Sequence, residues 1–166
     1  MFDYALFLVF PALLAFGGAY DLLTMTIPNR VSIALVALFL VAAPIAGLSA
    51  QDILMHVAAG LVVLAAGIAL FAVGGFGGGD AKLLAAGALW IGFDKLLPYL
   101  LNVAVFGGVL AMVILFYRRM PVLGIHTPDW AMNLHKSGTG IPYGIAIAAS
   151  ALMVYPHTAW FAASLA

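Results

Sequence analysis

Long apolar segments separated by short polar connections dominate this sequence and constrain its fold more than any other feature. A helix of about 20 mainly apolar residues is long enough to cross the hydrocarbon core of a bilayer. Segments of this length, or somewhat shorter, cover residues 4–20, 31–48, 53–73, 81–93, 98–117 and 141–161. They predict an all-α, polytopic membrane protein with six transmembrane helices.

The composition supports a membrane environment and excludes several other classes of protein. Hydrophobic residues make up 66% of the chain and charged residues 7%, whereas roughly a quarter of the residues in soluble domains are charged. A soluble chain of this length could not bury so much apolar surface, but lipid can surround it. The net charge of zero argues against nucleic-acid binding. Because there is no cysteine, the chain has no disulfide, no thiolate nucleophile and no Cys-ligated zinc.

The whole chain, residues 1–166, is predicted to form one membrane-embedded domain. Met1-Phe2-Asp3-Tyr4 lacks the basic region of a cleavable signal peptide, so we expect the first apolar segment to be retained as a span. The fourth segment is the weakest, because its apolar run would reach only about 20 Å as a helix. It spans if the helix begins near Asp80 and Lys95 snorkels to the membrane surface. The alternative is a re-entrant segment.

The distribution of positive charge predicts the orientation. The connections after the first, third and fifth segments carry Arg30, Lys82, Arg118, Arg119 and Lys136, whereas the opposite side carries only Lys95. Positive residues favour the cytoplasmic side, so these three connections are predicted to be cytoplasmic and both termini to lie outside. Five spans would largely remove the bias, which therefore favours six.

Two aspartates far apart in the sequence are expected at the same membrane face. Asp21 follows the first apolar segment and Asp80 precedes the fourth. Ionisable residues near hydrocarbon are costly, so both are functional candidates. Two adjacent carboxylates, one protonated and one ionised, can activate water and polarise a peptide carbonyl. The alternative is that both are interfacial helix caps, the role we expect of Asp52 and Asp94, and composition alone does not decide between the two.

Glycines surround the second of these aspartates. Gly77-Gly78-Gly79-Asp80 fits a Gly-x-Gly-Asp pattern, in which glycine permits a tight turn and the close approach of another backbone. The run is not a nucleotide-binding loop, because it lacks the Gly-Lys-Ser/Thr that a P-loop requires. The pattern therefore favours the functional interpretation of Asp80.

Three motifs, in order along the chain, resemble those of a known family. Asp21-Leu22-Leu23-Thr24-Met25-Thr26-Ile27-Pro28-Asn29 resembles the first aspartate motif of the prepilin peptidases, and Gly77-Gly78-Gly79-Asp80-Ala81-Lys82-Leu83 resembles the second. Ile141-Pro142-Tyr143-Gly144 resembles the opening of their last helix. The sequence is most similar to the short form that serves bacterial tight-adherence (Flp) pili.

The resemblance implies a GxGD aspartic endopeptidase in the bacterial cytoplasmic membrane, which cuts prepilins after a glycine on the cytoplasmic side of their hydrophobic helix. It implies Asp21 and Asp80 as the catalytic pair, with the following motif residues in support: Pro28, Asn29, Gly77, Gly79 and Lys82. The implied partners are the prepilin and membrane lipid, and neither a metal nor an organic cofactor is implied. Long-form members carry a cysteine-bearing cytoplasmic domain and also methylate the new N-terminus; neither the domain nor the cysteines occur here, so methyltransferase activity has no support.

Several further residues have more than one interpretation. Pro142, Tyr143 and Gly144 are possible substrate contacts, although anchoring at the membrane interface also explains the tyrosine. Lys82 could approach the substrate or simply snorkel, and Pro28-Asn29 could shape the site or simply begin a helix.

Small residues on the predicted helices are expected to permit close helix approach; these include Gly87, Gly107 and Gly108. Arg118 and Arg119 are expected to act as topology determinants. Two other functions stay open: a small proton- or cation-coupled transporter, and a non-enzymatic assembly factor of a pilus or secretion system.

Overall fold

The computed structural model describes residues 2–121 and 128–158. All regular secondary structure in these residues is helical, which confirms that the fold is all-α. The α-helices are α1 (Phe2–Thr24), α2 (Asn29–Ile45), α3 (Ala50–Ala72), α4 (Gly78–Ile91), α5 (Leu96–Tyr117), α6 (Asp129–His135) and α7 (Gly144–Val154). Short 3₁₀ turns at Phe93–Lys95 and Tyr155–His157 precede α5 and follow α7.

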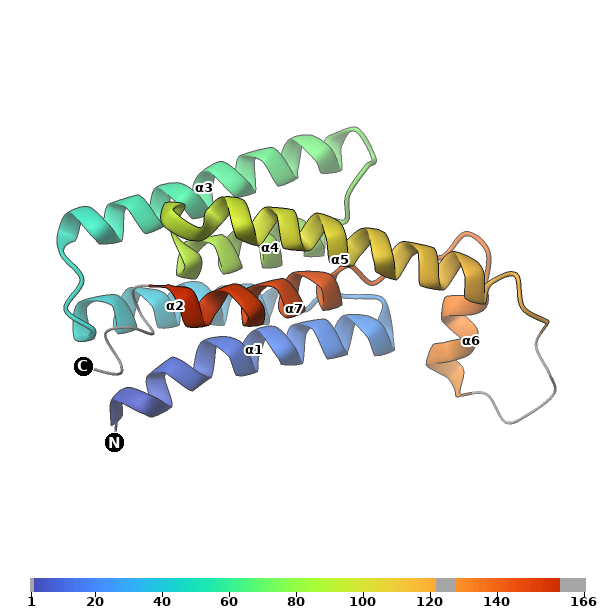
Figure 1. The fold of residues 1–166 in the computed structure, drawn as a ribbon, viewed down its shortest axis with the longest axis horizontal. Helices are drawn as coiled ribbons and strands as arrows, with labels where there is room; N and C mark the ends of the chain where they lie inside the picture. The colour runs from blue at the N-terminus through green and yellow to red at the C-terminus, as the bar shows by residue number, and fades with distance from the viewer. Residues whose placement is uncertain (1, 122–127, 159–166) are drawn as a thin grey trace.

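Six of these helices form a bundle in which successive helices run in alternating directions (Figure 1). Helices α1, α3 and α5 end at the right-hand end of the bundle in this view, where α2, α4 and α7 begin. The short helix α6 lies beside that same end. The end of α1 and the starts of α4 and α7 therefore come together, although the segments lie far apart in the sequence.

The six predicted segments are all helical, but their boundaries differ. The first helix continues through Thr24, so that Asp21 lies in its last turn and not after it. The sixth helix begins at Gly144, and the residues from 159 to the predicted end at 161 lie outside the described residues. The polar stretch 118–140, interpreted as a connection, contains the two-turn helix α6.

Within the described residues, two helices are long and apolar enough to cross a membrane, Ala50–Ala72 and Phe93–Tyr117. Shorter apolar helical segments cover Leu8–Thr24, Asn29–Ile45 and Gly144–His157. The shortest bundle helices, α4 and α7, pack against longer neighbours.

Helix α4 occupies the centre of the bundle. It has 14 residues, about 21 Å at 1.5 Å per residue, and nine of them are buried. It packs most extensively on α3, where glycine permits close approach: a Cβ at Gly67 would lie 2.8 Å from the Cβ of Ala81. At the far end of α4, the indole Nε1 of Trp90 donates to the carbonyl of Leu35 on α2 at 2.8 Å.

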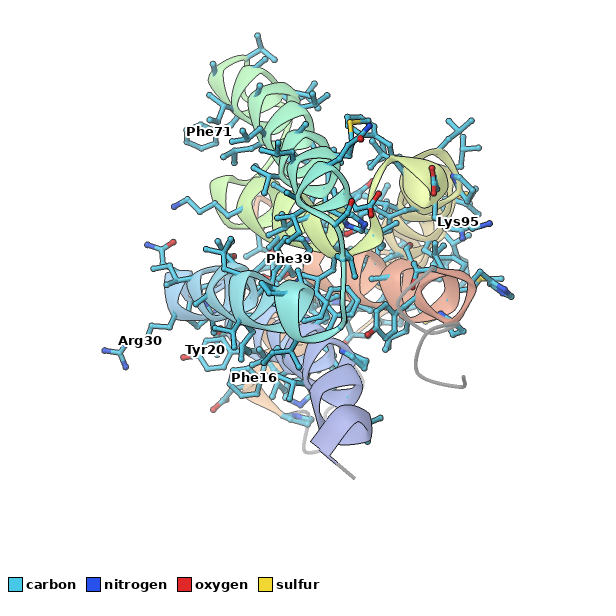
Figure 2. The ribbon with its side chains drawn as sticks, turned by 90° about the vertical axis from the view of Figure 1, so that its left-hand side faces the viewer. Phe16, Tyr20, Arg30, Phe39, Phe71 and Lys95 are labelled. Atoms are coloured by element: carbon cyan, nitrogen blue, oxygen red, sulfur yellow. The ribbon has the colours of Figure 1, made fainter. Side chains whose placement is uncertain are left out.

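The outer surface of the bundle is largely apolar. Phe16 and Phe71 are more than half exposed, and Figure 2 shows both pointing away from the helices, whereas the fully buried Phe39 points inward. Exposed apolar patches of this extent are rare on soluble monomers and are expected where lipid surrounds the protein.

Two helix ends have clear local causes. Helix α1 ends at Met25, whose φ of 57° is in the left-handed region that commonly terminates helices, and whose N–H donates to the carbonyl of Asp21 at 2.7 Å. Helix α3 begins with a capping box in which the Ser49 hydroxyl accepts from the backbone N–H of Asp52 and the Asp52 carboxylate accepts from that of Ser49. The predicted capping role of Asp52 is confirmed.

Candidate active site

Asp21 is fixed by the first residue of α7. Its side chain is buried with 5% of its surface exposed, and its Oδ2 accepts a hydrogen bond from the backbone N–H of Gly144 at 2.9 Å. The contact requires glycine, because a Cβ at Gly144 would lie 2.9 Å from both the Cβ and the Oδ2 of Asp21. One turn earlier in α1, a Cβ at Gly18 would lie 2.9 Å from the carbonyl oxygen of Gly144. Two glycines therefore let α1 and α7 approach closely enough for this hydrogen bond.

Asp80 lies in the first turn of α4. The N-cap of this helix is Gly77, and Asp80 is the third helical residue, so the interpretation of Asp80 as the N-cap is wrong. Its carboxylate makes no hydrogen bond to any residue that the structure describes. The glycines permit this packing: a Cβ at Gly77 would overlap the Asp80 carboxylate, which occupies that space, and a Cβ at Gly79 would lie 3.2 Å from the Cβ of Ile27.

The two carboxylates lie within range of an electrostatic interaction with each other. Each is also near a helix N-terminus, Asp21 at that of α7 and Asp80 at that of its own helix. The positive end of a helix dipole favours nearby negative charge, so two such ends reduce the cost of holding two carboxylates together. The arrangement can hold one ionised and one protonated carboxyl group on either side of a reacting group.

Lys82 and Asn29 meet each other but lie on a different side of α4 from the aspartate pair. The Nζ of Lys82 donates to the Oδ1 of Asn29 at 3.0 Å. Two residues along a helix correspond to a rotation of about 200°, so the lysine is directed away from Asp80. Both side chains line one end of an apolar groove of about 730 Å³ between α2, α3 and α4, and neither aspartate lines it. Pro28 is the N-cap of α2, as its interpretation as a helix start predicts.

The third motif is packed into the bundle. Pro142 is fully buried, and Gly144 is occupied by its contact with Asp21, so this conformation presents neither residue to a substrate. Tyr143 is the N-cap of α7, and its ring fills the space left by the missing side chain of Gly107 on α5. The ring also makes an edge-to-face contact with Phe76, with a centroid separation of 5.8 Å.

The predicted role of the glycines in helix approach needs correction. Gly107 accommodates the ring of Tyr143, and Gly87 accommodates the hydroxyl end of Tyr99, so both receive aromatic side chains and not helix backbones. Nothing lies within 4 Å of a Cβ built at Gly108. Phe76 is a site-forming residue that sequence reasoning missed, although it is the single aromatic residue within the run 74–79. Gly107 was identified for helix approach and not as the space that receives the Tyr143 ring.

Arg118 organises the connection that leads into α7. Its Nε donates to the carbonyl of Leu134 at 2.8 Å, and its Nη2 donates to the carbonyl and hydroxyl oxygens of Thr139 at 2.8 and 2.9 Å and to the carbonyl of Gly140 at 3.0 Å. Sequence reasoning assigned this arginine only to topology. The structure adds a local role, because these four acceptors lie just before Pro142.

A family model for the type IV leader peptidase family matches residues 8–112, more than half of the chain. The matched region contains Asp21, Asp80 and the glycines before Asp80, and it ends before the Ile141–Gly144 motif. No curated protein matches the chain, and no solved structure does.

Proposed function

The chain belongs to the type IV leader peptidase family, and on this basis we propose that it is an aspartic endopeptidase that removes prepilin leader peptides, with Asp21 and Asp80 as its catalytic pair. The observation that carries the proposal is the placement of these two carboxylates. They come from helices that are far apart in the sequence, interact electrostatically, and lie at the same end of the bundle. The family match favours a peptidase over a transporter or a non-enzymatic assembly factor.

The proposed reaction uses both carboxyl groups. The ionised carboxylate takes a proton from water as the water oxygen attacks the scissile carbonyl carbon, and the protonated group hydrogen-bonds to the carbonyl oxygen. The proton then passes to the leaving nitrogen as the C–N bond breaks. The Gly144 N–H keeps Asp21 oriented, and the missing side chain at Gly77 lets the Asp80 carboxylate take its position.

We further propose that the chain is a single domain that crosses the bacterial cytoplasmic membrane six times, with the Asp21–Asp80 end on the cytoplasmic side and both termini outside. The family and the apolar helices indicate a membrane protein. The alternating helix directions and the positive charges in the connections at the aspartate end support this topology. Helix α4 reaches less than a full bilayer thickness, and its burial among longer helices is compatible with this length.

We propose a short-form enzyme of the tight-adherence (Flp) type, which cuts after a glycine and does not methylate its product. The sequence contains no cysteine. Residues 25–28 alone connect α1 to α2, and residues 73–77 alone connect α3 to α4. These connections leave no room for an inserted cytoplasmic domain.

Cleavage of a prepilin fragment tests the proposal. The full chain in lipid vesicles is incubated with a peptide that contains the leader and hydrophobic helix of an Flp-type prepilin, and mass spectrometry identifies the new N-terminus. Wild type and the matched control Asp94→Asn, an exposed aspartate in the 3₁₀ turn before α5, should both cut. Asp21→Asn and Asp80→Asn should each lose at least about 10³-fold in rate, the scale found when a catalytic group is removed. Retained cutting by either variant defeats the assignment.

A further inference from the structure

The ring of Tyr143 packs against two parts of the chain that do not carry a catalytic aspartate: α5 and the connection before α4. On one side it occupies the space at Gly107 in α5, so closely that a Cβ there would overlap three ring atoms, Cε1, Cζ and Oη. On another side it meets the edge of Phe76, which belongs to the glycine-rich connection before Asp80. A tyrosine ring has only two side-chain torsions, so contacts on two sides leave it little freedom.

The residue that follows this ring carries the hydrogen bond to Asp21. Tyr143 is the N-cap of α7, and Gly144 is the first residue of the helix. A displacement of the Tyr143 backbone therefore moves the N–H that Asp21 accepts. Phe76 lies four residues before Asp80, so one aromatic contact joins the segment that leads to Asp80 with the segment whose Gly144 N–H holds Asp21.

We propose that Tyr143 and Gly107 are positioning residues: the notch at Gly107 receives the Tyr143 ring and thereby holds the Gly144 N–H on Asp21. The role differs from substrate contact, which is the function that sequence analysis suggested for Tyr143. A positioning residue acts on the rate of the chemical step, whereas a substrate contact acts first on binding. The activity readout rests on the proposed function, but the structural readout below does not.

A single NMR signal reports the hydrogen bond directly. Of the six tyrosines, only Tyr143 is followed by glycine. Protein labelled with ¹³C at tyrosine carbonyls and ¹⁵N at glycine therefore gives one carbonyl-to-amide correlation, that of Gly144, in detergent micelles. Asp21→Asn should shift the amide proton upfield, because a neutral acceptor makes the weaker hydrogen bond. No shift in this variant would show that the bond to Asp21 is absent, and the proposal would fail.

Gly107→Ala is the main test and Gly108→Ala its matched control. Gly107→Ala places a methyl group where the ring lies, so the Gly144 amide should shift in the same direction as in Asp21→Asn. Gly108→Ala adds a methyl group into open space one residue further along the same helix, and the signal should stay in place. A folded Gly107→Ala protein with an unchanged Gly144 signal would overturn the proposal.

Tyr143→Met keeps the proposal testable if Gly107→Ala does not fold. No methionine in the chain precedes glycine, so ¹³C-Met and ¹⁵N-Gly labelling again gives one signal. Loss of the rigid ring should shift the Gly144 amide upfield. Adding Gly107→Ala should then cost nothing more in thermal stability, because the clash is gone. An unshifted signal in Tyr143→Met, or a double variant less stable than Tyr143→Met alone, would contradict the proposal.

Steady-state cleavage separates positioning from substrate contact. Gly107→Ala and Tyr143→Met should lower kcat on the order of 10²-fold, the effect expected of a displacement near 1 Å, with KM nearly unchanged. An increase in KM at constant kcat would assign Tyr143 to substrate binding instead. If wild type cuts no prepilin, the proposed function fails while the NMR result still decides the positioning role.

Discussion

Asp21 and Asp80 differ in how the surrounding chain holds them. Asp21 accepts the Gly144 N–H, whereas the Asp80 carboxylate makes no hydrogen bond within the described residues and is bordered by Gly77 and Gly79. One carboxylate is thus held by a backbone donor, whereas the other is half-buried and has no such donor within the described residues. This asymmetry suits a pair in which a substrate or water completes the surroundings of the second group.

The Gly144→Ala substitution tests the fixed half of this arrangement. The new methyl group would lie 2.9 Å from Asp21 Oδ2 and force α1 and α7 apart or the carboxylate aside. Loss of a hydrogen bond to a charged group costs about 1.5–3 kcal/mol, so the cleavage rate should fall roughly 10- to 100-fold. Gly108→Ala is the control and should cut like wild type. Unchanged cleavage by Gly144→Ala would show that the hydrogen bond is not needed.

The Lys82→Gln substitution distinguishes the two interpretations of the lysine. The Lys82–Asn29 hydrogen bond is exposed and lies on the groove side of α4, so we expect less than about a 5-fold loss of cleavage, in line with the small energy of exposed charged pairs. The cleavage rates of Lys82→Gln and Asp80→Asn, measured in parallel, check this expectation. A loss as large as that of Asp80→Asn would mean that Lys82 acts at the catalytic pair.

At the scale of residues, sequence reasoning found those whose signal is local. Asp21 and Asp80 are conspicuous as charges in apolar surroundings, and Gly77 and Gly79 are conspicuous as a run. Phe76 was missed and Gly107 was assigned to helix approach, because the importance of both comes from a ring that lies in a different part of the chain. No sequence pattern states that Tyr143 will occupy the space beside Gly107.

Among the elements, α4 and the connection after α5 are the most distinctive. The apolar segments predicted the six bundle helices, and the short length of the fourth was visible as an apolar run of only about 20 Å. Helix α6 was missed because seven polar and mixed residues carry too little periodicity to signal a helix. Its place depends on Arg118, whose side chain binds backbone carbonyls of the same connection.

Arg118→Met, with its exposed neighbour Arg119→Met as control, tests how the connection is held. Removing a charged donor from four acceptors should cost at least about 1.5 kcal/mol, so amide hydrogen exchange in residues 134–140 should accelerate roughly tenfold or more. Arg119→Met should leave exchange there unchanged. Equal protection in both variants would show that the guanidinium does not hold this segment.

For the whole molecule, the alternation of helix directions places the connections that follow α1, α3 and α5 at the same end of the bundle. Charge counting on the sequence predicted this grouping, because Arg30, Lys82 and Arg118 lie in or close to those connections. It did not predict that α4 lies at the centre or that α7 packs between α1 and α5, since both depend on glycine contacts between distant segments.

Single cysteines test the topology, because the chain has none of its own. Gln51→Cys lies in the first turn of α3 and Ser137→Cys lies after α6, so that α3, α4 and α5 separate them. Three crossings put the two sites on opposite sides, so an impermeant maleimide should label Gln51→Cys in intact cells and Ser137→Cys only after permeabilisation. A re-entrant α4 leaves two crossings, and both cysteines would then label from the same side.

The most direct test of the central claim is whether Asp21 and Asp80 act as one unit. Single-turnover cleavage of the prepilin fragment is measured for Asp21→Asn, Asp80→Asn and the double variant. Groups that share one catalytic step are strongly non-additive, so the double variant should be no slower than the slower single variant. Two losses that multiply in the double variant, or a single variant that cuts like wild type, would contradict a catalytic pair.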